Sequence, residues 1–205
     1  VADELTQQGV IFTDLNTAVA EHGDLVQKYL MTQAVKPEDG KFASLHGALW
    51  HFGVFVHVPR GKVAELPLHV VIYNTKPGAT MGHVLVAVEE NAQLTMQVEY
   101  ASAEQDVQSS YVGATELIAG DAANLRYVSL QGWNRNTYEF SHQKGIAGRD
   151  AQLDWVNGVM GSRLTKAFIE VDAVGQGANA RVSGFFFADK NQFFDLDTQQ
   201  NHNAP

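Results

Sequence analysis

The 205-residue sequence contains no cysteine. Within these residues this absence excludes disulfides, zinc–thiolate sites and direct cysteine ligation of an iron–sulfur cluster. The sequence also has no apolar run near the roughly 20 residues that a membrane-spanning helix needs. Its N-terminus lacks the basic flank and the apolar stretch of a signal peptide. These absences argue against an integral membrane protein and against a disulfide scaffold.

Basic residues are scarce as well. The chain has 14 Lys and Arg against 23 Asp and Glu, which gives a formal net charge of -9. Such a charge repels a phosphate backbone and an anionic bilayer, so we expect neither nucleic acid nor a membrane as a partner. The sequence also lacks a P-loop, a G-x-S-x-G turn and the compact histidine spacings of a zinc site. No motif of these kinds therefore assigns a reaction.

What the sequence does contain is a five-residue repeat motif, here called the phrase, which occurs five times between residues 61 and 187. The phrase is Ala, polar, Leu or Ala, polar, large apolar, and its copies begin at Ala64, Ala92, Ala123, Ala151 and Ala178. Successive copies begin 28, 31, 28 and 27 residues apart, and four of the five have a glycine three residues before the Ala. A period near 28 with strand-like units favours a β-solenoid.

Alternation within each phrase is the period-2 pattern of a strand, so stacked copies should form ladders of like residues. We expect one apolar column of Leu66, Leu94, Leu125, Leu153 and Ala180, a second of Leu68, Met96, Tyr127, Trp155 and Val182, and an outward polar column of Glu65, Gln93, Asn124, Gln152 and Asn179. Further strands are expected at 52–58, 84–88, 115–118 and 166–174, whereas the pattern over 131–145 is the hardest to assign. The sequence thus predicts an all-β core over 51–205.

Residues 1–50 differ, because apolar residues there recur at helical spacing. We expect a short helical N-terminal cap that covers the first rung of the solenoid. Asp14 and Asp24 are the candidate N-caps of two short helices. A third helix should follow Pro37 and bury the face formed by Phe42, Leu45 and Leu49.

Three patterns suggest chemistry, and each has a simpler structural interpretation. Residues 175–180 match the dinucleotide pattern G-x-G-x-x-A, but a strand pattern follows where a helix is required, so we interpret them as a solenoid turn. His46, His51 and His57 are interpreted as packed or surface residues rather than metal ligands. Asp195 and Asp197 place two carboxylates on one strand face, with His202 nearby in sequence. A carbohydrate-active lyase or hydrolase that uses these two carboxylates is our alternative function.

Two segments resemble one protein family. Residues 47–68, GALWHFGVFVHVPRGKVAELPL, resemble the entry to the core of the SufB/SufD iron–sulfur cluster assembly scaffolds, and residues 193–205, FFDLDTQQNHNAP, resemble a late segment of that core. The resemblance implies a right-handed parallel β-helix, in agreement with the repeat. Because SufB-like members work through cysteines and this chain has none, it looks closer to SufD, as a core fragment.

The resemblance also implies a function. We expect a cytoplasmic, noncatalytic scaffold subunit of the SufBCD complex, in which the complex assembles the cluster and this chain binds no cofactor or metal directly. The implied partners are a SufB-type subunit, which pairs through the β-helix ends, and the SufC ATPase, which binds a C-terminal helical domain expected beyond residue 205. An unpaired edge near residues 193–200 should allow a homodimer.

Overall fold

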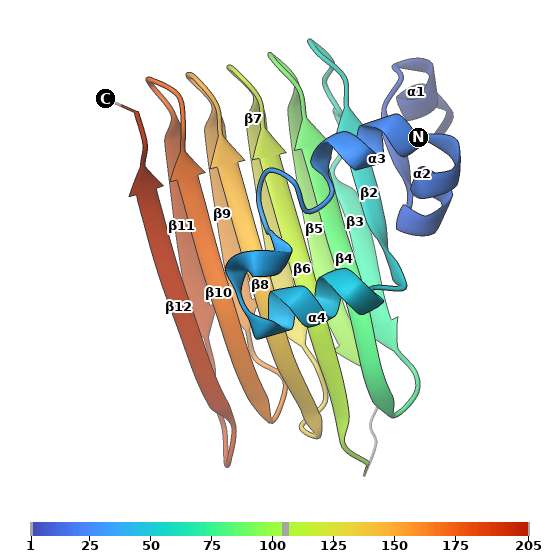
Figure 1. Cartoon of the computed structure of the whole chain (residues 1–205), viewed down its shortest axis with the longest axis vertical. Coiled ribbons are helices and arrows are strands. Elements are labelled where there is room, and N and C mark those ends of the chain that lie inside the picture. The colour runs from blue at the N-terminus through green and yellow to red at the C-terminus, as the bar shows by residue number, and fades with distance from the viewer. Residues whose placement is uncertain (1, 104–106, 205) are drawn as a thin grey trace.

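Two parallel β-sheets face each other in this chain, as a computed structural model shows (Figure 1). The structure describes residues 2–103 and 107–204. Within those residues one sheet has the order β1-β2-β4-β6-β8-β10-β12 and the other the order β11-β9-β7-β5-β3. From β2 onward consecutive strands alternate between the sheets, and this connectivity defines a β-solenoid. The predicted all-β parallel fold is confirmed.

The strand and helix bounds are as follows. The first sheet contains β1 (Ile11–Asp14), β2 (Phe52–Val58), β4 (Gly78–Val88), β6 (Ser109–Ala119), β8 (Thr137–Ala147), β10 (Leu164–Ala173) and β12 (Phe193–His202). The second contains β3 (Leu68–Asn74), β5 (Gln93–Ser102), β7 (Asn124–Gly132), β9 (Gln152–Val159) and β11 (Asn179–Phe186). The helices are α1 (Ala2–Gln7), α2 (Leu15–Glu21), α3 (Gly23–Tyr29), the 3-10 turn η1 (Pro37–Asp39) and α4 (Lys41–Leu49).

The repeat phrases form the second sheet in the predicted register. Leu94 lies opposite Leu125, and Leu125 opposite Leu153, in parallel strands. All three leucines are buried in the interior, whereas the polar residues that precede them are exposed. The periodic pattern therefore fixed both the pairing and the inward face of β5, β7 and β9.

The first copy of the phrase departs from the prediction at Leu66. The strand β3 begins only at Leu68, and the segment before it pairs with β5 through a single bridge between Val63 and Gln93. The Leu66 side chain is 51% exposed, so its predicted place in the buried column is wrong. The adjacent Pro67 has no N–H group to donate to a ladder, which explains why regular pairing is interrupted here.

Three of the four glycines that precede the phrases lie where stacked turns approach each other closely, whereas Gly61 is itself left-handed, at φ 69°. In four turns the left-handed residue is the one directly before the Ala, for example Asp150 at φ 56°. At Gly175 a Cβ atom would lie 2.1 Å from the backbone nitrogen of Arg149 in the turn below. Glycine is needed there because stacked turns approach each other closely.

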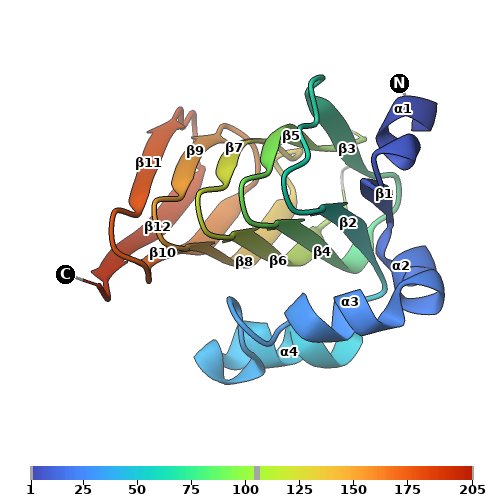
Figure 2. The same ribbon diagram turned by 90° about the horizontal axis from the view of Figure 1, so that it is seen from above.

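The N-terminal segment covers more of the solenoid than predicted. The strand β1 pairs antiparallel with β2 and so occupies that edge of the sheet. The helices α3 and α4 lie along the outer face of the first sheet rather than across the first rung (Figure 2). Contacts of α4 with β4, β6 and β8 confirm this placement.

The structure confirms one of the two predicted N-caps and corrects the other. Asp14 is the N-cap of α2, where its side chain accepts a hydrogen bond from the Thr17 amide, as expected. Asp24 instead lies within the first turn of α3, whose N-cap residue is His22.

The buried face of α4 differs from the predicted one. It buries Ala43 and His46, while Leu45 and Leu49 are 38% and 52% exposed. The face is set by contact with the sheet, which the apolar pattern of a short helix does not specify.

The helical cover buries the first part of the first sheet, from β2 to β6, on both faces. Its inward residues join the main core, and its outward residues Phe55, Leu85 and Ile118 form a second cluster with residues of α2 and α3. Nearly every residue of β4 and β6 is consequently buried. An outward position in these strands is therefore not a surface position.

Candidate functional site

One half of the solenoid interior is polar. The first residues of β8 alternate so that Thr137, Glu139 and Ser141 point inward, while Phe140 points outward and stacks on Phe42 of α4, with ring centroids 4.1 Å apart. Glu139, in β8, lies opposite Thr165 of β10 in the register. These positions bring a carboxyl group and several hydroxyl groups into the enclosed space between the sheets.

Gln131 of β7 connects the groups in this cluster. Its side-chain Nε2 donates to the carboxyl group of Glu139 and to Thr165 Oγ1 at 3.0 Å, and its Oε1 accepts from the Gly161 amide at 2.8 Å. Thr165 Oγ1 in turn lies 3.3 Å from Glu139 Oε2 and 2.6 Å from Ser162 Oγ. Every member is buried, so the network has fixed geometry.

Burial changes the acid–base chemistry of Glu139. Removal from water raises the pKa of its carboxyl group to about 7, while hydrogen bonds from Gln131 and Thr165 act in the opposite direction. A carboxyl group with this pKa can take up or release a proton near neutral pH. Glu139 is the strongest candidate for proton exchange in the interior.

Aromatic side chains line the same space. The Trp133 ring lies 4.9 Å from Tyr111 and 5.5 Å from Tyr100, measured between ring centroids. The polar and aromatic side chains enclose a cavity of about 20 Å³ bordered by Tyr100, Tyr111, Ser129, Asn157 and Glu139. That is enough for roughly one water molecule. The site can thus hold a water-sized polar molecule against a proton-exchanging carboxyl group.

A second buried polar cluster lies on the other side of the first sheet. His46 of α4, His83 of β4 and Glu116 of β6 form a continuous hydrogen-bonded chain between the helix and the sheet. None of the three side chains is exposed. The prediction that His46 is a packed residue is confirmed, but its polar partners were not anticipated.

The other two histidines singled out in the sequence lie apart from this cluster. His57 is buried, and its Nε2 lies 3.2 Å from Glu89 Oε1. His51 is exposed at the end of α4. In the part of the chain that the structure describes, no group of three or more His, Cys, Asp or Glu side chains has a metal-binding arrangement.

Asp195 and Asp197 lie on the outer face of β12 with Lys166 between them. The Lys166 ammonium is 2.9 Å from Asp195 and 2.6 Å from Asp197. The hydrogen bonds that Lys166 donates to Asp197 and Asp195 raise the pKa of its ammonium group. His202 is at the far end of β12 and, by strand alternation, on the opposite face. The structure gives the two carboxylates a shared cation on a strand surface and does not favour an acid and base pair.

The glycine-rich segment is a solenoid turn, as interpreted. Gly177 adopts φ 74°, and the strand β11 follows. A nucleotide phosphate would need a helix N-terminus at that position.

Sequence reasoning missed Gln131, Glu139 and Thr165. A signal was present, because Thr137, Glu139 and Ser141 alternate with Tyr138, Phe140 and His142. Such a pattern normally places the polar residues outside, and only the helical cover reverses the faces.

Among the described residues no helix has the length and apolar character needed to span a bilayer.

Comparison with known proteins gives two family matches. Residues 2–70 match the SufBD protein N-terminal region, and residues 71–205 match the SufBD core domain of the SUF iron–sulfur cluster assembly system. The chain is 33% identical over 162 residues to the iron–sulfur cluster assembly protein SufD of Bacillus subtilis, covering 78% of this chain and 37% of that protein. It is 28% identical over 203 residues to SufBD family proteins of Staphylococcus epidermidis and Staphylococcus aureus, covering 98% of this chain and 43% of each relative. The chain therefore spans about two-fifths of the length of these relatives.

Proposed function

This chain belongs to the SufBD family of iron–sulfur cluster assembly proteins, and from that premise we propose that it is a noncatalytic scaffold subunit of a cytoplasmic SufBCD complex. The observation that carries the proposal is the family match along residues 2–205 in a chain without cysteine. Without a thiolate, these residues have no usual ligand for a nascent cluster. Their role is to hold partners in place while the complex assembles the cluster.

The proposed partners are a SufB-type subunit and the SufC ATPase. Exposed aromatic side chains near the last two strands support the first contact. Within the described residues β12 pairs only with β10, and β11 only with β9. Phe185, Phe186, Phe187 and Phe193 are 49%, 66%, 72% and 60% exposed at this end. A group of exposed aromatic rings favours association with an apolar partner surface.

Co-purification tests the proposal. The tagged full-length subunit is co-expressed with SufB-type and SufC-type proteins of its own organism, and we expect all three to elute together, whereas residues 1–205 alone should not retain the SufC-type protein. Cluster content, measured by absorption and iron analysis, should follow the SufB-type subunit. Retention of neither partner would contradict the scaffold role.

The place of the contact is tested with Phe193→Ser. We expect this change to weaken capture of the SufB-type subunit, and also any self-association seen by analytical ultracentrifugation. Tyr73→Ser is the matched control, because Tyr73 is 55% exposed on β3 at the other end of the second sheet. Equal effects of the two changes would argue against the surface around Phe193 as the interface.

A further inference from the structure

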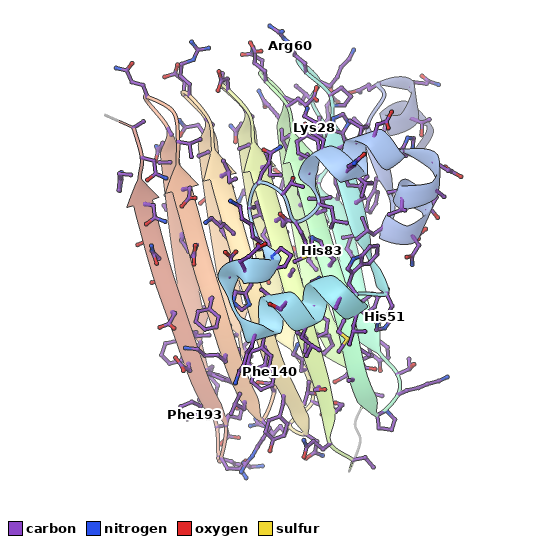
Figure 3. All side chains as sticks on the ribbon, in the orientation of Figure 1. Lys28, His51, Arg60, His83, Phe140 and Phe193 are labelled. Atoms are coloured by element: carbon purple, nitrogen blue, oxygen red, sulfur yellow. The ribbon has the colours of Figure 1, made fainter. Side chains whose placement is uncertain are left out.

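Three buried ionisable side chains connect the helical cover to the first sheet. His46 Nε2 lies 2.9 Å from His83 Nδ1, and His83 Nε2 lies 3.0 Å from Glu116 Oε1. Figure 3 labels His83 where it lies beside the ribbon of α4. The three groups form a linear chain, and none is exposed to solvent.

Backbone groups fix both ends of this chain. His46 Nδ1 is 3.2 Å from the carbonyl oxygen of Val112. The Glu116 carboxylate accepts from the Met31 amide at 2.7 Å and from the Val35 amide at 3.1 Å. A carbonyl oxygen only accepts and an amide only donates, so these contacts fix the direction of the hydrogen bonds at both ends of the chain.

The directions permit one mobile proton. His46 Nδ1 must donate to Val112. Burial, together with the nearby His83, lowers the pKa of His46 to about 3, so its Nε2 is unprotonated and accepts from His83 Nδ1. One proton then remains between His83 Nε2 and Glu116 Oε1.

One mobile proton more, or one fewer, would break the hydrogen-bonded chain. A second proton, on His46 Nε2, would set two N–H groups against each other across 2.9 Å. Loss of the shared proton would set the His83 lone pair against the carboxylate across 3.0 Å. Both arrangements are repulsive, and burial leaves little solvent screening to reduce the repulsion.

We propose that His46, His83 and Glu116 form a single-proton latch that holds α4 and residues 31–35 on the outer face of the first sheet. The opening constant of the latch is lowest at the pH where its closed form and its open form bind the same number of protons. The latch loosens on both the acid and the alkaline side of that pH.

The number of protons that each form binds gives the direction of the pH effect on opening, above and below that pH. Once the helix lifts away, water reaches the latch, and an imidazole in water has a pKa of about 6.5. Below that pH the open form binds more protons than the closed form, so acid favours opening. Above it the closed form binds more protons, so alkali favours opening. The opening constant should be lowest near pH 6.5, about threefold higher one pH unit away on either side, and should then approach a tenfold rise per unit.

Other charged groups face the latch. His51, which follows α4, and His142 of β8 both oppose protonation of His46. His142 has a pKa lowered by its own burial, with Asp39 of η1 acting in the opposite direction. His142 can thus add to the acid response and must be separated from the latch.

Hydrogen exchange measured by mass spectrometry tests the latch. The rates for residues 31–49 are corrected for the pH dependence of chemical exchange, and β5 and β7 are the internal reference. His46→Gln offers one donor and one acceptor but takes no proton, so we expect the acid increase to vanish and the alkaline increase to remain. Glu116→Gln removes the shared proton, and here the alkaline increase should vanish while the acid increase remains.

His142→Gln is the matched control and should keep the minimum near pH 6.5. A wild-type profile that is flat or changes in one direction only overturns the proposal. An acid increase that survives in the double variant His46→Gln/His142→Gln, or one that His142→Gln alone removes, overturns it too. If Glu116→Gln does not fold, the response of His46→Gln still decides the question.

Discussion

Tyr127 and Trp155 meet edge to face inside the solenoid, with ring centroids 6.2 Å apart and ring planes at 83°. They are direct partners in the parallel pairing of β7 and β9, and neither ring is exposed. Aromatic pairs of this geometry contribute about 0.5–1.5 kcal/mol beyond the area they bury. The repeat thus places two large rings in consecutive rungs, where they fill the space between the sheets.

We expect Trp155→Ala to lower the free energy of unfolding by about 3–5 kcal/mol, because it removes a fully buried ring and leaves Tyr127 without its partner. Urea melts monitored by circular dichroism measure the change. Phe187→Ala is the control, since Phe187 is 72% exposed. Superimposable melts of wild type and Trp155→Ala would place Trp155 outside the core.

Gly161→Ala should destabilise the protein by about 1–3 kcal/mol or more, as over-packing generally does. A Cβ atom at Gly161 would lie 2.2 Å from the backbone nitrogen of Trp133, which cannot move aside without disturbing β7 and its neighbours. Gly23→Ala is the matched control, because a Cβ atom there meets nothing within 4 Å. Thermal melts that show the same midpoint for both variants would contradict this close approach.

Glu139→Gln should remove one pH-dependent contribution to stability. The pKa of Glu139 is raised to about 7, so the folded protein keeps a proton that the unfolded chain releases above its ordinary pKa of 4.5. The contribution is fully present below that ordinary pKa and is lost as pH rises through 7. Between pH 5 and 7 the stability of wild type should therefore fall by about 1–3 kcal/mol relative to Glu139→Gln.

Urea melts at pH 5, 6 and 7 measure this difference, and the exposed Glu65→Gln serves as control. A difference that does not change with pH would show that Glu139 titrates as it does in water.

We expect the purified chain to retain no stable iron–sulfur cluster after anaerobic reconstitution, because its 205 residues supply no thiolate ligand. Visible absorption and iron content per chain provide the measurement. A stoichiometric, stable cluster would contradict the expectation and direct attention to the histidines and carboxylates.

The candidate site was only partly accessible to prediction. Buried positions for Leu94, Leu125 and Leu153 follow from alternation alone, and the structure confirms them. The same rule fails for Glu139, because β8 carries its apolar residues on the outer face, under α4. A pattern of alternation shows that a strand has two unlike faces, but it does not show which face meets the core.

The sequence by itself determined the solenoid, since a phrase that repeats at strand spacing must stack like residues in register to bury its leucines. Only the tertiary structure decided where the polar chemistry lies. His46 is 37 residues from His83, and His83 is 33 residues from Glu116. They meet because α4 folds back over the outer face of the first sheet, a contact between a helix and strands that no local pattern records. Repetition encodes contacts between equivalent positions, whereas contacts between unlike elements depend on how their surfaces fit together.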